Sequence, residues 1–225
     1  AGTHPDYTAG VNLWMGSRLR GNDSRERNDG GGDLEAIADF LPAFSVSSDA
    51  QANALQKMQL HLDDKPILAL CPGAEFGPAK RWPAEYYATV ANKKLAEGWH
   101  VWLFGSAKDK VITDPVMQLT EQRCENLAGR TSLGDSIDLL SLAKSVVTND
   151  SGLMHIAAAL NKPLIALYGP TSPGFTPPLS SSATILSTHL DCQPCFARIC
   201  PLKHHRCMRE LLPAQVVDIL SKGEK

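Results

Sequence analysis

The sequence predicts an α/β fold in which helices cover both faces of a parallel, Rossmann-like sheet. Short apolar runs at residues 67–71 and 164–168 are continuously hydrophobic, as strands buried on both faces are. Longer segments between such runs carry helix-start and helix-stop residues, so strands and helices alternate along the chain. With 225 residues, of which 43% are hydrophobic, the chain suits one well-buried domain and is too short for two large ones.

Caps and helix breakers mark the individual elements. The stretch Ser47–Asp49 is suited to cap a helix over residues 50–62. Pro83 suits the first position of the next helix, which Gly98 ends. The same patterns predict further strands at 101–104, 125–127 and 145–148, helices at 133–143, 151–160 and 213–221, and a weaker helix that Pro115 interrupts.

Composition and motifs exclude several classes of protein. The formal net charge of −2 gives no indication of a nucleic-acid partner. No run approaches the roughly 20 apolar residues of a membrane-spanning helix, and the N-terminal residues lack the basic-then-apolar pattern of a secretory signal. The G-x-G-x-x-G and G-x-x-x-x-G-K-[ST] fingerprints do not occur, which disfavours a dinucleotide oxidoreductase and a P-loop NTPase.

Residues 1–33 differ in composition from the rest of the chain. They contain seven glycines, four arginines and five acidic residues, but only three Leu or Val residues. Such a segment has too few apolar side chains to bury. We therefore expect a flexible leader over residues 1–33 and one domain over residues 34–225.

The segment 147–160 gives the strongest indication of a binding site. The preceding strand leads to Asp150 and Ser151, both good helix caps, and Gly152 then lets a ligand approach the backbone. Free N–H groups and the positive end of the helix dipole suit a pyrophosphate there. The alternative is that Asp150 and Ser151 merely cap the helix and that His155 is a partly buried histidine with satisfied hydrogen bonds.

Two further loops follow predicted strands, where ligands bind in sheets of this kind. In the loop at 71–83, Lys80 precedes a helix and can neutralise phosphate charge, although a solvated Lys80-Arg81 pair is the alternative. In the loop at 103–109, Asp109 can accept hydrogen bonds from ribose hydroxyls or serve as a helix N-cap.

Together these segments resemble the C-terminal half of the ADP-heptose:lipopolysaccharide heptosyltransferase II family, which are GT-B enzymes of glycosyltransferase family 9. The resemblance covers residues 34–221 and rests on the runs CPGAEFGPAKRWP, LFGSAKD, NLAGRTSL, VTNDSGLMHIAAALNKPLIALYGPTSP and FTPPLS. It implies that the domain is the C-terminal, donor-binding domain of a GT-B fold. It also implies an N-terminal domain, without a counterpart in this sequence, that holds the acceptor and the catalytic base.

The resemblance implies roles for individual residues. Lys80 contacts the pyrophosphate and the heptose, Asp150 holds sugar hydroxyls, and both are expected to be catalytic. The N–H groups of residues 151–153 bind the phosphates, His155 supports their loop, and the loop around Thr131 flanks adenine. The full set of implied substrate-binding residues is Ala74, Glu75, Phe76, Lys80, Ser106, Asp109, Thr131, Asp150, Ser151, Gly152, Leu153 and His155.

The implied reaction transfers heptose from ADP-heptose to a heptosylated Kdo-lipid A acceptor in the lipopolysaccharide inner core. It is an inverting displacement in which a base takes the acceptor proton, while Lys80 and the helix N-terminus stabilise the departing phosphate. No metal and no other cofactor is implied. The resemblance implies a cytoplasmic enzyme in peripheral contact with the inner face of the inner membrane. The alternative is a non-catalytic remnant that still binds an ADP-sugar.

Four of the six cysteines have the spacing C-x2-C-x4-C-x6-C between Cys192 and Cys207, with two histidines inside. Zinc accepts such ligands, but the spacing is more compressed than in an ordinary zinc ribbon or finger. Free thiols in a reduced cytosolic protein are the alternative, and a metal-dependent interaction module is a third functional hypothesis. Four Lys and Arg residues between 198 and 209 also make this segment basic, which suits either a phosphorylated lipid or solvent.

Overall fold

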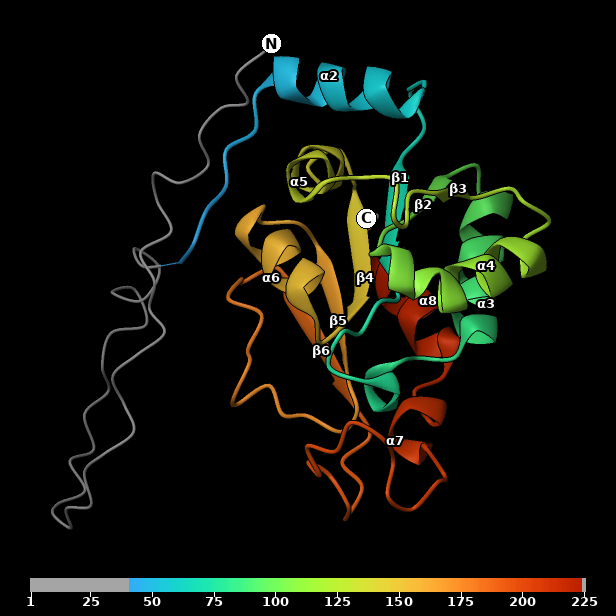
Figure 1. Cartoon of the computed structure of the whole chain (residues 1–225), viewed down its shortest axis with the longest axis vertical. Coiled ribbons are helices and arrows are strands. Elements are labelled where there is room, and N and C mark those ends of the chain that lie inside the picture. Colours follow the sequence, from blue (N-terminus) through green and yellow to red (C-terminus); the bar gives the residue numbers. More distant parts are fainter. Residues whose placement is uncertain (1–40, 224–225) are drawn as a thin grey trace, which may run out of the picture.

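The computed structural model describes residues 41–223, which form a six-stranded sheet with helices on both faces (Figure 1). Every strand pairs with its neighbours in parallel, in the order β3-β2-β1-β4-β5-β6. The predicted fold class is therefore confirmed. The predicted leader at residues 1–33 and its boundary with the domain lie outside the described residues.

The strands are β1 (Ile67–Cys71), β2 (His100–Leu103), β3 (Glu125–Asn126), β4 (Ser145–Asn149), β5 (Leu164–Tyr168) and β6 (Ala183–Ser187). The helices are α2 (Ser48–Met58), α3 (Ala84–Ala96), α4 (Lys110–Leu119), α5 (Leu133–Leu140), α6 (Gly152–Ala159), α7 (Arg206–Arg209) and α8 (Pro213–Lys222). Two short 3-10 turns, η1 (Pro78–Lys80) and η2 (Ala107–Asp109), follow β1 and β2. Each strand from β1 to β4 leads into a helix, as the alternating pattern predicts.

Several elements differ from the predictions. Helix α5 ends at Leu140 instead of residue 143, and the short helix α7 was not predicted. Helix α2 ends at Met58 instead of residue 62, because Gln59 takes a left-handed conformation with φ of 58°. Helix α4 continues through Pro115, which removes one N–H donor without ending the helix. Strand β6 was not predicted, because it is a partly exposed edge strand and lacks the continuous apolar run of a buried one.

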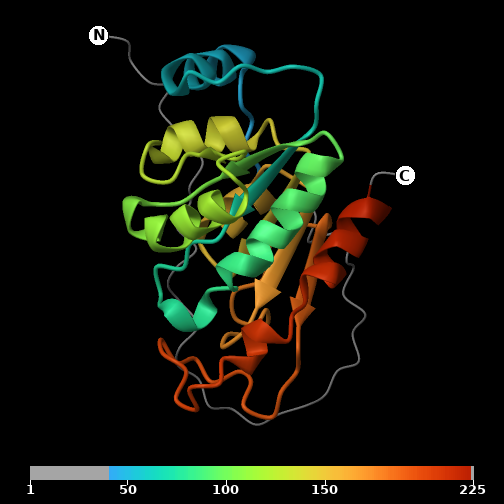
Figure 2. The ribbon, with the colours of Figure 1, turned by 90° about the vertical axis from the view of Figure 1, so that its right-hand side faces the viewer.

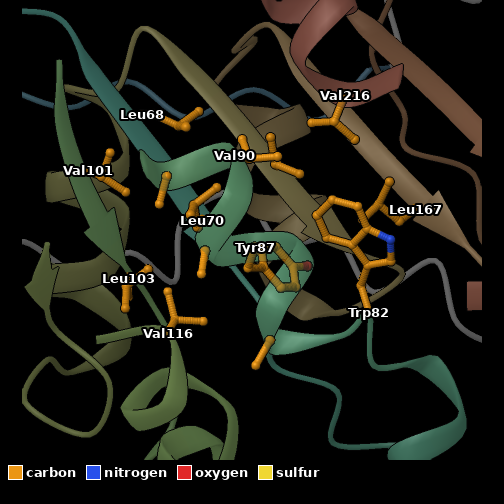
Figure 3. Packing of buried hydrophobic residues seen from close by; sticks show 14 of the residues in the cluster. Leu68, Leu70, Trp82, Tyr87, Val90, Val101, Leu103, Val116, Leu167 and Val216 are labelled. Atoms are coloured by element: carbon orange, nitrogen blue, oxygen red, sulfur yellow. The ribbon is translucent and has the colours of Figure 1, made fainter. Parts of the chain in front are cut away.

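The sheet separates two hydrophobic cores. In β1, Leu68 and Leu70 point into the core that α3, α4 and α8 cover, and Figure 3 shows them with Trp82 and Tyr87. In Figure 2, α3 and α8 lie in front of the sheet. The alternate β1 residues, including Cys71, point into the opposite core beneath α2, α5 and α6. Burial on both faces explains why this strand is apolar throughout.

The strand order positions a ligand site. In such a sheet the order reverses between β1 and β4, so the connections after these strands leave on opposite faces and open a crevice at the carboxyl ends. Within residues 41–223, no helix is both long enough and apolar enough to cross a membrane.

Candidate functional site

A cavity of about 460 Å³ lies where the loops after β1, β2, β3 and β4 meet. This volume falls within the range of roughly 300–1,000 Å³ found for small-molecule sites. Its lining residues are Gly73, Ala74, Glu75, Gly105, Ser106, Asp109, Thr131, Ser132, Leu133, Ser136, Ser151, Gly152, Leu153 and Ile156. The cavity therefore brings together four loops that are far apart in the sequence.

Most of the predicted site residues line this cavity. They are Ala74, Glu75, Ser106, Asp109, Thr131, Ser151, Gly152 and Leu153. The other four predicted residues, Phe76, Lys80, Asp150 and His155, are not part of its lining. Lys80 and Asp150 instead belong to a separate polar cluster.

Asp109 is fixed at the end of β2. Its Oδ2 accepts hydrogen bonds from the backbone N–H and the hydroxyl of Ser106, both at 2.8 Å. Its Oδ1 has no donor within the described part of the chain and remains free to accept one. A Cβ atom at Gly73 would lie 2.7 Å from Oδ2, so the loop after β1 requires glycine there. Asp109 is thus a cavity residue whose side chain closes the capping box of η2, whereas at the N-cap position of α4 it makes no side-chain capping bond.

Helix α6 begins at the cavity without a side-chain cap. Ser151 is its N-cap residue, but its Oγ lies 3.3 Å from the Thr148 hydroxyl and makes no capping bond. In contrast, Ser132 caps α5 by accepting from the Asp135 N–H. A Cβ atom at Gly152 would meet nothing within 4 Å. The start of α6 is therefore open to a ligand, and its first-turn N–H groups suit an anion.

Beside the cavity, the side chains of Lys80, Asp150, Thr171 and Thr176 form the Lys80 cluster. Lys80 Nζ lies 2.6 Å from Asp150 Oδ2, and the two side chains are only 11% and 4% exposed. Thr171 Oγ1 donates to the same oxygen at 2.6 Å, and Thr176 Oγ1 donates to Asp150 Oδ1 at 3.2 Å. Both carboxylate oxygens of Asp150 are therefore already hydrogen-bonded by the chain's own groups.

Phe76 and His155 surround this cluster. The Lys80 ammonium lies 4.9 Å from the centre of the Phe76 ring, and the Arg198 guanidinium lies 5.3 Å from it. Desolvation by neighbouring protein atoms lowers the pKa of His155, while the Asp150 charge raises it and the Lys80 charge lowers it. The His155 ring makes no hydrogen bond within residues 41–223, and the residue is exposed.

The sequence did not identify several residues that shape the site. Buried Asn149 donates from Nδ2 to the Pro72 carbonyl at 2.8 Å and accepts from the Tyr87 hydroxyl at 3.0 Å. It thereby ties the loop after β1 to the end of β4. Its position directly before Asp150 was the one available indication. Nothing in the sequence indicated a role for Thr176, because its contact with Asp150 depends on how the loop after β5 folds.

Comparison with known proteins identifies related chains. The sequence model of glycosyltransferase family 9 (heptosyltransferase) matches residues 36–206. The chain is 51% identical over 152 residues to lipooligosaccharide heptosyltransferase 2 of Haemophilus influenzae, which is 64% of this chain and 44% of that protein. It is 42% identical over 184 residues to lipopolysaccharide heptosyltransferase 2 of Escherichia coli, with coverage of 80% and 53%.

The fold is similar to a solved structure of the same kind. The structure of E. coli ADP-heptose lps heptosyltransferase II superimposes with a TM-score of 0.71 at 42% sequence identity. The match covers 81% of this chain and 53% of that one. The chain thus spans about half the length of the relatives it matches.

Proposed function

Because the chain belongs to glycosyltransferase family 9, the heptosyltransferases, we propose that its domain binds the donor ADP-heptose. The corresponding enzyme transfers heptose to heptosylated Kdo-lipid A in the inner core of lipopolysaccharide, at the cytoplasmic face of the inner membrane. The observation that carries this proposal is the uncapped start of α6, which opens through Gly152 onto a cavity large enough for a nucleotide.

The donor fits the cavity in one orientation. The pyrophosphate binds the N–H groups at the start of α6, where the helix dipole favours negative charge. The ribose hydroxyls donate to the free Oδ1 of Asp109, and adenine lies against Thr131 and Leu133 at the start of α5. The polar groups that meet the donor thus come from three different loops of the sheet.

The Lys80 cluster supplies charge stabilisation next to the cavity. When the pyrophosphate arrives, the Lys80 ammonium shares its charge between Asp150 and the phosphate oxygens. Thr171 and Thr176 hold the Asp150 carboxylate in place, so that it can also accept a sugar hydroxyl. As ADP leaves, Lys80 and the start of α6 stabilise the growing negative charge. The acceptor and the base belong to the part of a heptosyltransferase that this chain does not match.

Calorimetric titration tests donor binding. We expect ADP and ADP-heptose to bind with similar affinity and UDP-glucose to bind much more weakly, because Thr131 and Leu133 are proposed to contact adenine. A Gly152→Val variant should lose ADP binding and still fold, since a Cβ atom at this position meets nothing within 4 Å. Equal binding of UDP-glucose, or unchanged ADP binding by the variant, would show that the proposed site is wrong.

A transfer assay tests the proposal that the donor site and the catalytic base belong to different halves of the enzyme. The 225-residue chain alone should bind donor but transfer no heptose, because Glu75, Asp109 and Asp150 are all assigned to the donor. Adding the N-terminal half of a family member should restore some turnover if the two halves associate. Transfer by the chain alone at the rate of a full-length relative would place a base within this sequence.

A further inference from the structure

The segment at residues 188–205, between β6 and α7, contains neither helix nor strand. Connections longer than about 12–15 residues without secondary structure are uncommon in a compact domain and are often functional. This segment includes Cys192, Cys195 and Cys200, and Cys207 follows in the first turn of α7. None of the four forms a disulfide, and the donor site uses none of them.

The four cysteines line one small cavity together with His204. Its volume of about 20 Å³ is enough for a single ion or water molecule and far too small for an organic ligand. Cys200 and Cys207 are only 8% and 7% exposed, whereas Cys192 is half-buried and Cys195 is exposed. The cavity is therefore lined by two buried cysteines and by two that are more accessible to solvent.

We propose that Cys192, Cys195, Cys200 and Cys207 bind one zinc ion as a tetrahedral tetrathiolate site. Four sulfur ligands select zinc or iron over harder cations, and zinc binds thiolates at about 2.3 Å. As the side chains now stand, no three His, Cys, Asp or Glu groups in residues 41–223 converge enough to hold an ion. Closing the site therefore requires rotation of cysteine side chains, each about a single Cα–Cβ bond.

The position of this site suggests what the ion stabilises. Its cavity is also lined by Ala79 of η1 and by Pro170 after β5. The Ala79 N–H donates to the Arg198 carbonyl at 3.0 Å, and the Phe196 N–H donates to the Pro170 carbonyl at 2.8 Å. The 188–205 segment is therefore hydrogen-bonded to the loops that carry Lys80 and Thr171. A bound zinc would fix this segment and, through it, the Lys80 cluster, without taking part in the transfer reaction.

Metal reconstitution of the full chain tests the proposal. The protein is reduced, freed of metal and titrated with zinc or with cobalt(II) as a spectroscopic probe. We expect one ion per chain, intense thiolate-to-cobalt charge-transfer bands with a tetrahedral d–d pattern, and a melting temperature several degrees higher with zinc. Because donor binding is measured separately with ADP, failure of this proposal and failure of the proposed function are distinguishable.

Substitutions identify the ligands. Cys192→Ser and Cys195→Ser change side chains that are not fully buried, so these variants should fold and yet lose the charge-transfer bands and most of the zinc affinity. Cys124→Ala, which changes a core thiol, and His204→Ala should both retain one ion. The proposal is overturned if the reduced chain binds no zinc, if Cys192→Ser and Cys195→Ser bind it as the parent does, or if binding depends on His204 or Cys124.

Discussion

The donor cavity and the Lys80 cluster are neighbours that differ in how their polar groups are satisfied. In the cavity, the start of α6 has no side-chain cap and Asp109 Oδ1 has no donor within the described chain. In the Lys80 cluster, Asp150 is paired with Lys80 and with two threonines. The cavity is ready for a ligand, whereas the cluster already contributes to folding. Substitutions in the cavity should therefore alter ADP binding alone. Substitutions in the Lys80 cluster should alter both ADP binding and the free energy of unfolding.

The largest expected effect on ADP binding is that of Gly152→Val. The valine side chain would occupy the space that the phosphate needs, and we expect ADP to bind more than about 100-fold more weakly, which corresponds to roughly 2.7 kcal/mol. Because a Cβ atom here meets nothing within 4 Å, the free energy of unfolding should hardly change. Calorimetry and chemical denaturation measure the two effects. A large loss of stability would mean that the start of α6 is packed and not open.

The substitution Lys80→Met should lower both the free energy of unfolding and the affinity for ADP. Removing the ammonium leaves the Asp150 carboxylate buried without its cation, which typically costs about 3 kcal/mol of unfolding free energy. The loss of a charged contact to phosphate should weaken ADP binding by about 1.5–3 kcal/mol. Adding Asp150→Asn to this variant should restore part of the stability without restoring ADP binding. If Lys80→Met is as stable as the parent, the ion pair does not contribute to folding.

The substitution Thr171→Val should lower the free energy of unfolding by less than Lys80→Met does. It removes one hydrogen bond to a buried carboxylate, which is expected to lower the free energy of unfolding by about 1.5 kcal/mol. ADP binding should weaken less than in Lys80→Met, because the ammonium remains. Thr171→Ser keeps the hydroxyl and is the matched control for denaturation and calorimetry. If Thr171→Val is as stable as the parent, the hydrogen bond from Thr171 to Asp150 does not contribute to folding.

Asp135→Asn should have the smallest effect, because it alters a helix start at the cavity that already has its cap. Burial acts to raise the pKa of Asp135, but hydrogen bonds from Lys57 and Ser132 leave it below its ordinary value of 3.8. The ionised group therefore stabilises the folded state above pH 3.8, and this contribution is lost as the pH falls through the lowered value.

At neutral pH we expect Asp135→Asn to lower stability by about 1 kcal/mol, the usual size of a lost cap. The difference in unfolding free energy between this variant and the parent should become smaller as the pH falls below 3.8. ADP affinity should stay unchanged, since the Asp135 side chain is only 4% exposed and does not line the cavity. Denaturation at several pH values measures the first effect, and weaker ADP binding would contradict the assignment of Asp135 to folding.

Much of the fold could be predicted because local patterns and tertiary structure agree in the centre of the sheet. Strands β1 and β5 lie at the predicted residues, since a strand buried on both faces must be apolar throughout. The cavity residues after β1, β2 and β4 followed from the strand ends. Edge strand β6 escaped prediction because it is half in water, where no apolar run is required.

Long-range polar contacts could not be predicted. The Asn149 side chain meets Tyr87 and Pro72, which lie on other elements, and nothing local marks it as their partner. In the same way, the family resemblance implied that Asp150 holds sugar hydroxyls, but nothing in the sequence indicated that Thr171 and Thr176 also bind it. The sequence pattern identifies the side chains that follow the strand ends. Which of these side chains contact one another depends on the loop conformations, and these form only in the completed sheet.

The strand order also determines when the cavity forms during folding. Strand β1 pairs with β2, which is the next strand along the chain, but its other neighbour, β4, follows only after α4, β3 and α5. Bringing β4 to β1 is slow, because the conformational entropy of the intervening chain is lost before the contacts between the two strands form. Since α6 follows β4, a partly folded chain holding only β1 and β2 lacks the helix start that we propose as the phosphate site. On that proposal, a nucleotide binds only the completed sheet and shifts the folding equilibrium toward it.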